Sequence, residues 1–329
     1  MDEEGRNFCD LHLHLGAAVS SHFLWEIAHE QGISLPQKDY WEFLDFFKIK
    51  KTTPEKYLRS LDREISPFVL TQKIQSSPLA VEKCIHHIVS RAYREWSLKK
   101  VEIRFNPFLR NKEGLFDVDK IVLAATVGLH KAMIEYPIKA GIILETDRQF
   151  NRKYHQIIVE KAIKYKNMGV VGVDVSGPNP KNGFNLDDLV EPFVFAKKNG
   201  LKITFHTGEF TDASEMWQVI EKISPHRIGH GIAAYKDKNL MKEIKRKNIV
   251  LEICPTSNIK TQVVKNWQEL RLIIQTFIAN KVPFTINSDG PEFFSTNVKK
   301  EYQILIKKKI ISQTQTRKII NFSYYQSFI

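Results

Sequence analysis

Cysteine is scarce in this chain of 329 residues, and the few cysteines do not form paired spacings. Cys9, Cys84 and Cys254 stand far apart in the sequence. This pattern argues against a disulfide framework and against a four-cysteine zinc site. Reduced thiols are typical of the cytoplasm, and we expect the protein to be located there.

Long apolar runs and a targeting segment are missing as well. No apolar stretch reaches the ~18 residues that a membrane-spanning helix needs. Residues 1–4 read MDEE and are acidic, whereas a signal peptide begins with a basic segment followed by an apolar one. We therefore expect no membrane partner.

The chain also lacks a linker rich in proline, glycine or serine, and it has no short internal repeat. A single domain over residues 1–329 is the simplest organisation. The net charge of +12 is spread over several lysine-rich helical patterns. Because charge runs usually lie on exposed helix faces, we expect a basic, solvated surface rather than a nucleic-acid partner. The sequence says nothing about the oligomeric state.

Eight short β-branched runs, separated by helical patterns, make up most of the chain. They cover residues 10–15, 101–107, 141–146, 170–177, 201–206, 227–231, 249–254 and 283–289. Strands that alternate with helices at this period predict a parallel sheet, and eight of them predict an α/β fold closed into a (β/α)8 TIM barrel. Residues 20–80 show helical spacing without a clear strand, which predicts a helical segment inserted after the first strand. Its part at 36–78 is either a lid over the barrel mouth or a packed decoration.

The pair His12 and His14 in the first run is the first sign of chemistry. Side chains two residues apart on a strand point to the same side. Two imidazoles directed at one point form half of a metal site, although the same spacing also occurs on solvated strands. Further ligand residues elsewhere in the sequence are needed to distinguish a metal site from a solvated strand.

Further polar residues lie where the other predicted strands end, and in such barrels the carboxyl ends of the strands meet at one catalytic mouth. These ends carry Gly177, His206, Glu209, His230 and Asp289. Zinc accepts imidazole nitrogens and a carboxylate oxygen and keeps one position for water in catalytic sites. Such a donor set would come from His12, His14, His206 and Asp289. The sequence therefore predicts one zinc ion per chain at this mouth.

Five motifs together resemble the adenosine deaminase family of metal-dependent amidohydrolases. They are HLHL at 12–15, HTGE at 206–209, RIGHG at 227–231, LEICPTSN at 251–258 and SD at 288–289. Their order and separations agree with the family from residue 8 to about 295, and the end of the chain resembles the family's usual end. The resemblance implies hydrolytic deamination of adenosine, or of a closely related 6-aminopurine nucleoside, to an inosine-type product and ammonia.

The resemblance also implies roles for individual residues. The family's zinc ligands correspond to His12, His14, His206 and Asp289, and His14 is also expected near the substrate. Glu209 matches the acid that protonates ring nitrogen N1, and His230 matches the residue that orients and helps to deprotonate the attacking water, which Asp289 also contacts. Gly177 matches the glycine whose backbone N–H binds ring nitrogen N3. Without the resemblance, Glu209 could instead cap a helix, His230 could be structural, and Gly177 could be a turn glycine.

Two glycines depart from the family's pattern. Relatives that act on adenosine usually carry an aspartate near ring nitrogen N7, where this chain has Gly290, and another near the ribose 5′-hydroxyl, where it has Gly16. Each lost hydrogen bond costs ~1–3 kcal/mol of discrimination between substrates. Gly16 also leaves room for a larger or anionic 5′ group. Glu292 stands two residues after Gly290 and could reach back into the site.

These departures leave several alternatives for the function. The same deamination could act on adenine, on an aminofutalosine-type nucleoside, or on a 5′-substituted or N6-modified adenine nucleoside or nucleotide. A non-catalytic purine- or nucleic-acid-binding relative is a second class. A hydrolase of phosphoesters or lactams is a weaker third, because the fourth strand ends in Ser176 and Gly177 rather than in a metal-bridging carboxylate or lysine. Cys254 has no adjacent base, so we interpret it as structural, and the zinc signature of cytidine-type deaminases is missing.

Overall fold

A computed structural model of the chain describes residues 8–61, 66–110, 117–180 and 183–329. Its strands are all parallel to their neighbours and form two sheets with the orders β1-β2-β3-β4-β5 and β6-β7-β8-β9. The strands are β1 (Phe8–His14), β2 (Leu98–Phe105), β3 (Lys139–Asp147), β4 (Val170–Ser176), β5 (Lys202–Ile203), β6 (His206–Thr207), β7 (Arg227–His230), β8 (Val250–Ile253) and β9 (Phe284–Ile286).

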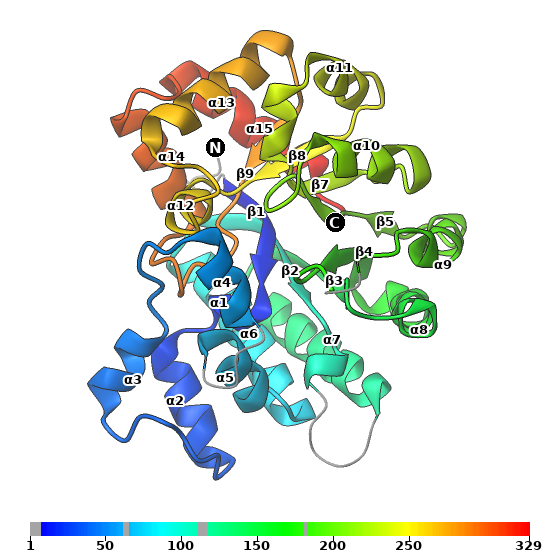
Figure 1. Ribbon diagram of the computed structural model, residues 1–329. Helices are drawn as coiled ribbons and strands as arrows, with labels where there is room; N and C mark the ends of the chain where they lie inside the picture. Colours follow the sequence, from blue (N-terminus) through cyan, green and yellow to red (C-terminus); the bar gives the residue numbers. More distant parts are fainter. Residues whose placement is uncertain (1–7, 62–65, 111–116, 181–182) are drawn as a thin grey trace.

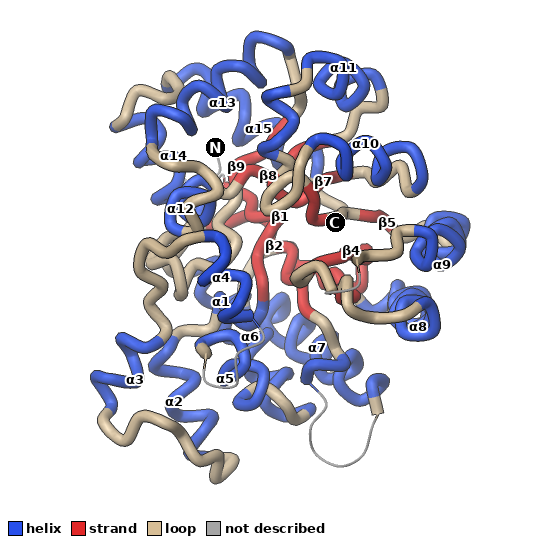
Figure 2. The backbone as a smooth tube through the Cα atoms, viewed as in Figure 1, coloured by secondary structure: helices blue, strands red, loops and turns tan. Residues whose placement is uncertain are grey.

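The two sheets meet at both of their edges, which gives the barrel its ring of strands (Figure 2). β5 and β6 are two parts of the predicted fifth strand, and the His226 N–H, just before β7, donates to the Ile203 carbonyl of β5 at 2.9 Å. At the other edge the His14 N–H donates to the Asp289 carbonyl, and the Asp289 N–H donates to the His12 carbonyl, both at 2.9 Å. All eight predicted strands are present, and the predicted parallel α/β barrel is confirmed.

Helices alternate with the strands and lie outside them (Figure 1). After β1 come α6 (Pro78–Arg94), α7 (Val118–Glu135), α8 (Arg152–Lys164), α9 (Asp187–Lys198), α10 (Ala213–Lys222), α11 (Lys238–Arg246), α12 (Pro255–Lys260), α13 (Trp267–Asn280), α14 (Val298–Lys307) and α15 (Gln313–Gln326), with short 3-10 turns η1 (Phe108–Arg110), η2 (Lys166–Met168) and η3 (Ile232–Lys236). Polar side chains fix many of the helix starts. Ser77, for example, accepts a hydrogen bond from the Ala80 N–H, which satisfies one of the free donors in the first turn of α6.

The described part of the stretch between β1 and α6 is helical, in line with its sequence pattern. It contains α1 (Leu15–Ala18), α2 (Ser21–Glu30), α3 (Tyr40–Phe46), α4 (Pro54–Leu61) and α5 (Pro67–Ile74). Phe43 and Phe47 are buried, and the ring of Phe47 stacks on that of Phe293, which follows β9. The helical segment is therefore packed against the loop after the last strand. None of the helices in the described ranges combines the length and the apolar character needed to cross a membrane.

Candidate active site

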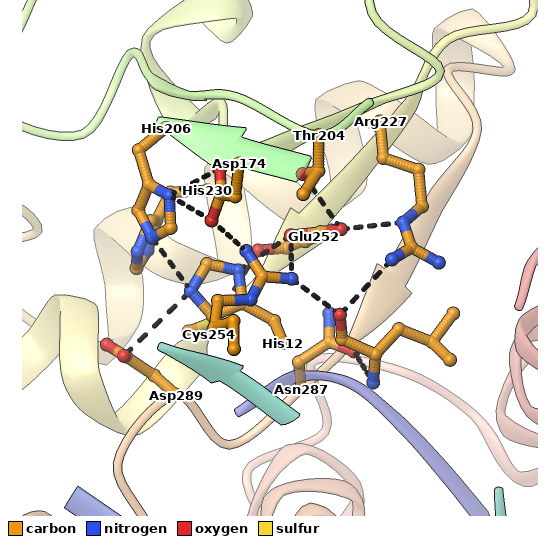
Figure 3. A network of polar contacts seen from close by, with 12 residues as sticks. His12, Asp174, Thr204, His206, Arg227, His230, Glu252, Cys254, Asn287 and Asp289 are labelled. Carbon is orange, nitrogen blue, oxygen red and sulfur yellow. Dashed lines mark hydrogen bonds and ion pairs between the residues drawn. The ribbon is translucent and has the colours of Figure 1, made fainter. Parts of the chain in front are cut away.

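Three imidazole rings converge at the mouth of the barrel, and Figure 3 shows two of them, those of His12 and His206. His12 and His14 lie near the end of β1, and His206 is the first residue of β6. The Nε2 atom of His206 lies 3.1 Å from Nε2 of His12 and 3.2 Å from Nε2 of His14. The structure thus brings the two histidines of the first strand together with one that is almost 200 positions away.

Each of these rings has a buried carboxylate at its other nitrogen. The pairs are His12 Nδ1 with Glu252 (2.7 Å), His14 Nδ1 with Glu145 (3.1 Å) and His206 Nδ1 with Asp174 (3.0 Å). An ionised carboxylate only accepts hydrogen bonds, so we assign the proton of each ring to Nδ1 and a lone pair to Nε2. Three lone pairs that face one another at this distance repel unless a cation lies between them.

The spacing of these nitrogens fits a metal ion with tetrahedral coordination. Two nitrogens at ~2.0–2.1 Å from zinc in such an arrangement lie about 3.3 Å apart. Asp289 adds a carboxylate, whose Oδ1 lies 3.5 Å from His14 Nε2 and 3.9 Å from His12 Nε2. Its Oδ2 accepts a hydrogen bond from Ser257 Oγ at 2.6 Å. The four residues predicted as ligands therefore surround one point, and their donor atoms suit zinc.

The electrostatics of the rings favour a positive charge at this point. Burial, with help from the positive charge of Arg104, holds the pKa of His12 well below its usual range, so its ring stays neutral and available as a ligand. Burial is the largest single effect on His14 and opposes its protonation, but the charge and hydrogen bonding of Glu145 together with the charge of Asp289 raise the pKa of that ring. The surroundings of these rings therefore favour a bound cation, while the ring of His12 stays unprotonated.

Glu209 and His230 lie next to each other beside this cluster. Glu209 Oε2 is 3.4 Å from His230 Nε2. Burial, followed by the charge of Asp289, raises the pKa of Glu209 well above its usual range, which favours the protonated form of its carboxyl. Burial, followed by the charge of His206, holds the pKa of His230 well below its usual range, so its ring is neutral. A proton donor and a proton acceptor are thus placed side by side.

Asn258 holds the second nitrogen of His230. Its amide Nδ2 lies 3.0 Å from His230 Nδ1, and its buried Oδ1 has no partner among the described residues. An amide carries both a donor and an acceptor, so turning it would let Oδ1 accept a hydrogen bond from the Nδ1–H of His230. Asn258 can therefore support either neutral tautomer of His230, including the one whose Nε2 accepts a proton.

Gly177 ends the fourth strand in a left-handed conformation, with φ at +91°. A Cβ atom at this position would stand 2.7 Å from the carboxylate of Asp147. Both the conformation and the close approach require glycine here. The turn role considered for Gly177 is therefore real, and its predicted contact with ring nitrogen N3 remains a prediction.

Gly16 and Gly290 are the two glycines that depart from the family's pattern, and neighbouring groups fill the space beside both of them. A Cβ atom on Gly290 would stand 2.8 Å from the Ala17 side chain, so an aspartate cannot fit there without a shift of the backbone. A Cβ atom on Gly16 would stand 3.0 Å from Nη2 of Arg110. Glu292 does not replace the missing aspartate, because its Oε1 accepts from Ser21 N–H at 2.9 Å and from Ser21 Oγ at 2.7 Å.

Our sequence reasoning missed the carboxylates behind the histidines. Glu145, Asp174 and Glu252 each stand inside an apolar strand run, and all three are buried. An acidic residue in such a run is a usable signal, because a buried carboxylate needs a charged or hydrogen-bonding partner. Arg104 on β2 joins two of them, with Nη1 at 2.8 Å from Asp174 and Nη2 at 2.9 Å from Glu252.

The chain is similar to known proteins over nearly its whole length. The family described as "Adenosine deaminase" matches residues 8–329. An adenosine deaminase of Clostridium kluyveri is 30% identical over 321 residues, covering 97% of this chain and 88% of that protein. Among solved structures, an adenine deaminase from Arthrobacter aurescens has a TM-score of 0.85 at 18% identity, covering 99% of this chain and 94% of that one. An Arabidopsis N6-mAMP deaminase has a TM-score of 0.81 at 21% identity, covering 98% and 94%. The chain belongs to the adenosine deaminase family, metal-dependent hydrolases that act on C–N bonds in cyclic amidines.

Proposed function

We propose that this enzyme uses one zinc ion to deaminate a 6-aminopurine nucleoside, of which adenosine is the simplest, to the inosine-type product and ammonia. The observation that carries the proposal is the position of Asp289 and of three imidazoles, each paired with a carboxylate, beside the buried carboxyl of Glu209, whose pKa is raised. The names of the similar proteins support it, since they act on adenosine, adenine or N6-mAMP. All of these carry an exocyclic nitrogen at position 6 of a purine.

The side chains divide the proton transfers of this reaction between them. Zinc, held by His12, His14, His206 and Asp289, would supply a Lewis acid that makes water a nucleophile at neutral pH. Glu209 donates its proton to ring nitrogen N1, which draws electrons from C6 and opens that carbon to attack. His230 takes a proton from the attacking water through Nε2 and passes it to the 6-amino group, so that the C6–N6 bond breaks and ammonia leaves. The Gly177 N–H holds ring nitrogen N3 and orients the base between these groups.

We further propose that the chain is one catalytic domain over residues 1–329, with the helical segment 20–80 covering the mouth of the barrel. Tyr57 of α4 supports this, because its ring stacks on that of Phe210, next to Glu209, with 5.5 Å between the ring centres. The Ile49 N–H also donates to the Phe293 carbonyl at 2.8 Å, just after the last strand. Excluding water in this way would keep Glu209 protonated.

The test combines metal analysis with kinetics of purified protein. We expect about one zinc per chain and a loss of adenosine absorbance that depends on that metal. Glu209→Gln keeps the shape of the side chain but cannot donate the proton, so it should lower kcat by about 100-fold or more while zinc content and unfolding midpoint stay close to those of the wild type. Glu221→Gln, on the exposed face of α10, is the matched control.

Two results would contradict the proposal. A zinc-loaded wild type that turns over no 6-aminopurine nucleoside or nucleotide would favour the non-catalytic, purine-binding alternative. A Glu209→Gln variant with full activity would remove Glu209 from the role of the acid.

A further inference from the structure

Four arginines among the described residues are almost completely buried, and only one of them lacks a carboxylate partner. The partnered ones are Arg104 with Asp174 and Glu252, Arg148 with Glu215, and Arg227 with Glu102 and Glu252. Arg110 is 6% exposed, and no hydrogen bond or ion pair joins its side chain to any residue that the structure describes. Its Nε is enclosed without an acceptor. Because an unpaired buried charge is costly, Arg110 is suited to bind an anion from outside the chain.

This guanidinium lies close to the metal-binding histidines. Arg110 ends η1, a turn that follows β2 at the mouth of the barrel. Its Nη2 stands 3.0 Å from the place where a Cβ atom on Gly16 would be, and Thr71 Oγ1 stands 3.2 Å from the same place. Gly16 is two residues after His14. The guanidinium therefore takes the space that a side chain at position 16 would occupy.

The charge at this position is the opposite of the charge expected from the family's pattern. An aspartate at position 16 would place a negative charge near the 5′ end of the sugar. Here Gly16 carries no charge, and Arg110 brings a positive one. Burial lowers the pKa of Arg110 to about 10, so the guanidinium is still charged at neutral pH.

Lysines line a cavity in the helical segment, between residues 45 and 68. The cavity has a volume of about 430 Å³, and its lining includes Lys51, Lys56 and Tyr57. Lys48 and Lys50 also line it and lie 3.5 and 3.7 Å from the carboxylate of Asp45 in the same lining, so the lysines outnumber this one acid. Tyr57 joins it to the mouth through the stacking on Phe210. Clustered positive charges raise the local concentration of anions, so they would draw an anionic substrate toward the site.

We propose that Arg110 binds an anionic group at the 5′ position of the substrate's sugar, so that an adenine nucleoside 5′-monophosphate is preferred over the free nucleoside. This inference rests on the proposed deaminase function and narrows its substrate. The planar fork of a guanidinium matches two phosphate oxygens, which gives stronger and more directional binding than a neutral donor. Gly16 contributes because a side chain at this position would collide with the guanidinium.

The test compares adenosine with adenosine 5′-monophosphate on the zinc-loaded enzyme, and adds calorimetric binding of inosine and inosine 5′-monophosphate as a readout without turnover. We expect the wild type to have a kcat/KM at least about tenfold higher for the monophosphate, because hydrogen bonds to charged groups are strong. Arg110→Gln should lower that value, and the affinity for inosine 5′-monophosphate, by about 10- to 100-fold, and should lower the value for adenosine less than about threefold. Arg94→Gln removes an exposed arginine on α6 and is the matched control.

The outcomes separate this inference from the deaminase function. If the enzyme deaminates adenosine and Arg110→Gln lowers kcat/KM equally for adenosine and its 5′-monophosphate, the anion site is overturned and the deaminase function stands. Absence of turnover together with Arg110-dependent binding of inosine 5′-monophosphate would overturn the deaminase and support the anion site. Absence of both would overturn both proposals.

Discussion

The site depends most on the carboxylates that hold the histidines. Each of them fixes the tautomer of one ring, and without it the Nε2 lone pair would not be directed at the metal. Glu145 is the simplest of the three to test, because Asp174 and Glu252 are also paired with Arg104. Its Oε1 lies 3.1 Å from His14 Nδ1, and the side chain is buried at the end of β3.

Replacing Glu145 with glutamine should weaken metal binding without unfolding the protein. The amide oxygen stays near His14 Nδ1, but it is neutral and makes the ring a poorer ligand. We expect zinc affinity to fall about 10- to 100-fold, as for other residues that support metal ligands. Competition with a zinc chelator measures it, with the exposed Glu160→Gln as the control. Unchanged affinity would show that Glu145 does not act through His14.

How far the site could be predicted from sequence depends on whether the residues act through strand geometry or through packing. His12, His14, His206 and Asp289 could be found because alternation along a strand and the barrel mouth place them together. The neighbours of Gly16 and Gly290 could not be found in this way. Arg110 and Ala17 fill those spaces through contacts between loops, and no local pattern encodes such contacts.

At the scale of elements, the alternation of strands and helices can be predicted from the sequence, but the interruption of the fifth strand cannot. The run at 201–206 was predicted as one strand and is divided into β5 and β6 at residues 204–205. Thr204 turns its hydroxyl to Glu252, donating a hydrogen bond at 3.1 Å. This contact supports the carboxylate behind His12, so the interruption has a structural reason that lies on another strand.

Glu292 links the helical segment to the barrel. Its carboxylate accepts two hydrogen bonds from Ser21 at the start of α2 and lies 3.3 Å from Arg91 of α6. A carboxylate at a helix N-terminus also interacts favourably with the helix dipole. Glu292 therefore acts as an anchor for α2, rather than as a replacement for the aspartate missing at position 290.

Glu292→Ala should therefore cost stability and leave the choice of purine unaltered. We expect the free energy of unfolding to fall by about 1–2 kcal/mol, since hydrogen bonds to a charged acceptor are lost. Urea denaturation measures this, and the ratio of kcat/KM for adenosine and a purine changed at N7 is the second readout. A stable variant with an altered ratio would instead place Glu292 against the substrate.

At the scale of the whole molecule, buried carboxyls make the stability depend on pH. Glu301 on α14 is fully buried, and its oxygens accept hydrogen bonds from Thr296 Oγ1 and, at 3.1 Å, from the Thr256 N–H. Burial raises its pKa from 4.5 to about 7, and the nearby charge of Asp10 acts in the same direction. The folded protein thus favours the protonated form of this side chain.

The sign of the effect follows from this shift. The stabilisation is complete below the unfolded pKa of 4.5 and is lost as the pH rises through about 7. At 1.36 kcal/mol per pKa unit, the free energy of unfolding should fall by about 3 kcal/mol across that window through this group alone. Glu301→Gln stays neutral at every pH, keeps an acceptor for Thr256, and should remove this part of the dependence.

The measurement is the difference in unfolding free energy between Glu301→Gln and the wild type, from urea titrations at about pH 5 and about pH 8. Other titrating groups cancel in that difference, because both proteins carry them. We expect the variant to gain stability relative to the wild type as the pH rises, whereas the surface control Glu221→Gln should show no such trend. A difference that stays constant between the two pH values would mean that Glu301 is ionised in the folded protein, and that Lys260 or the two threonines stabilise its charge.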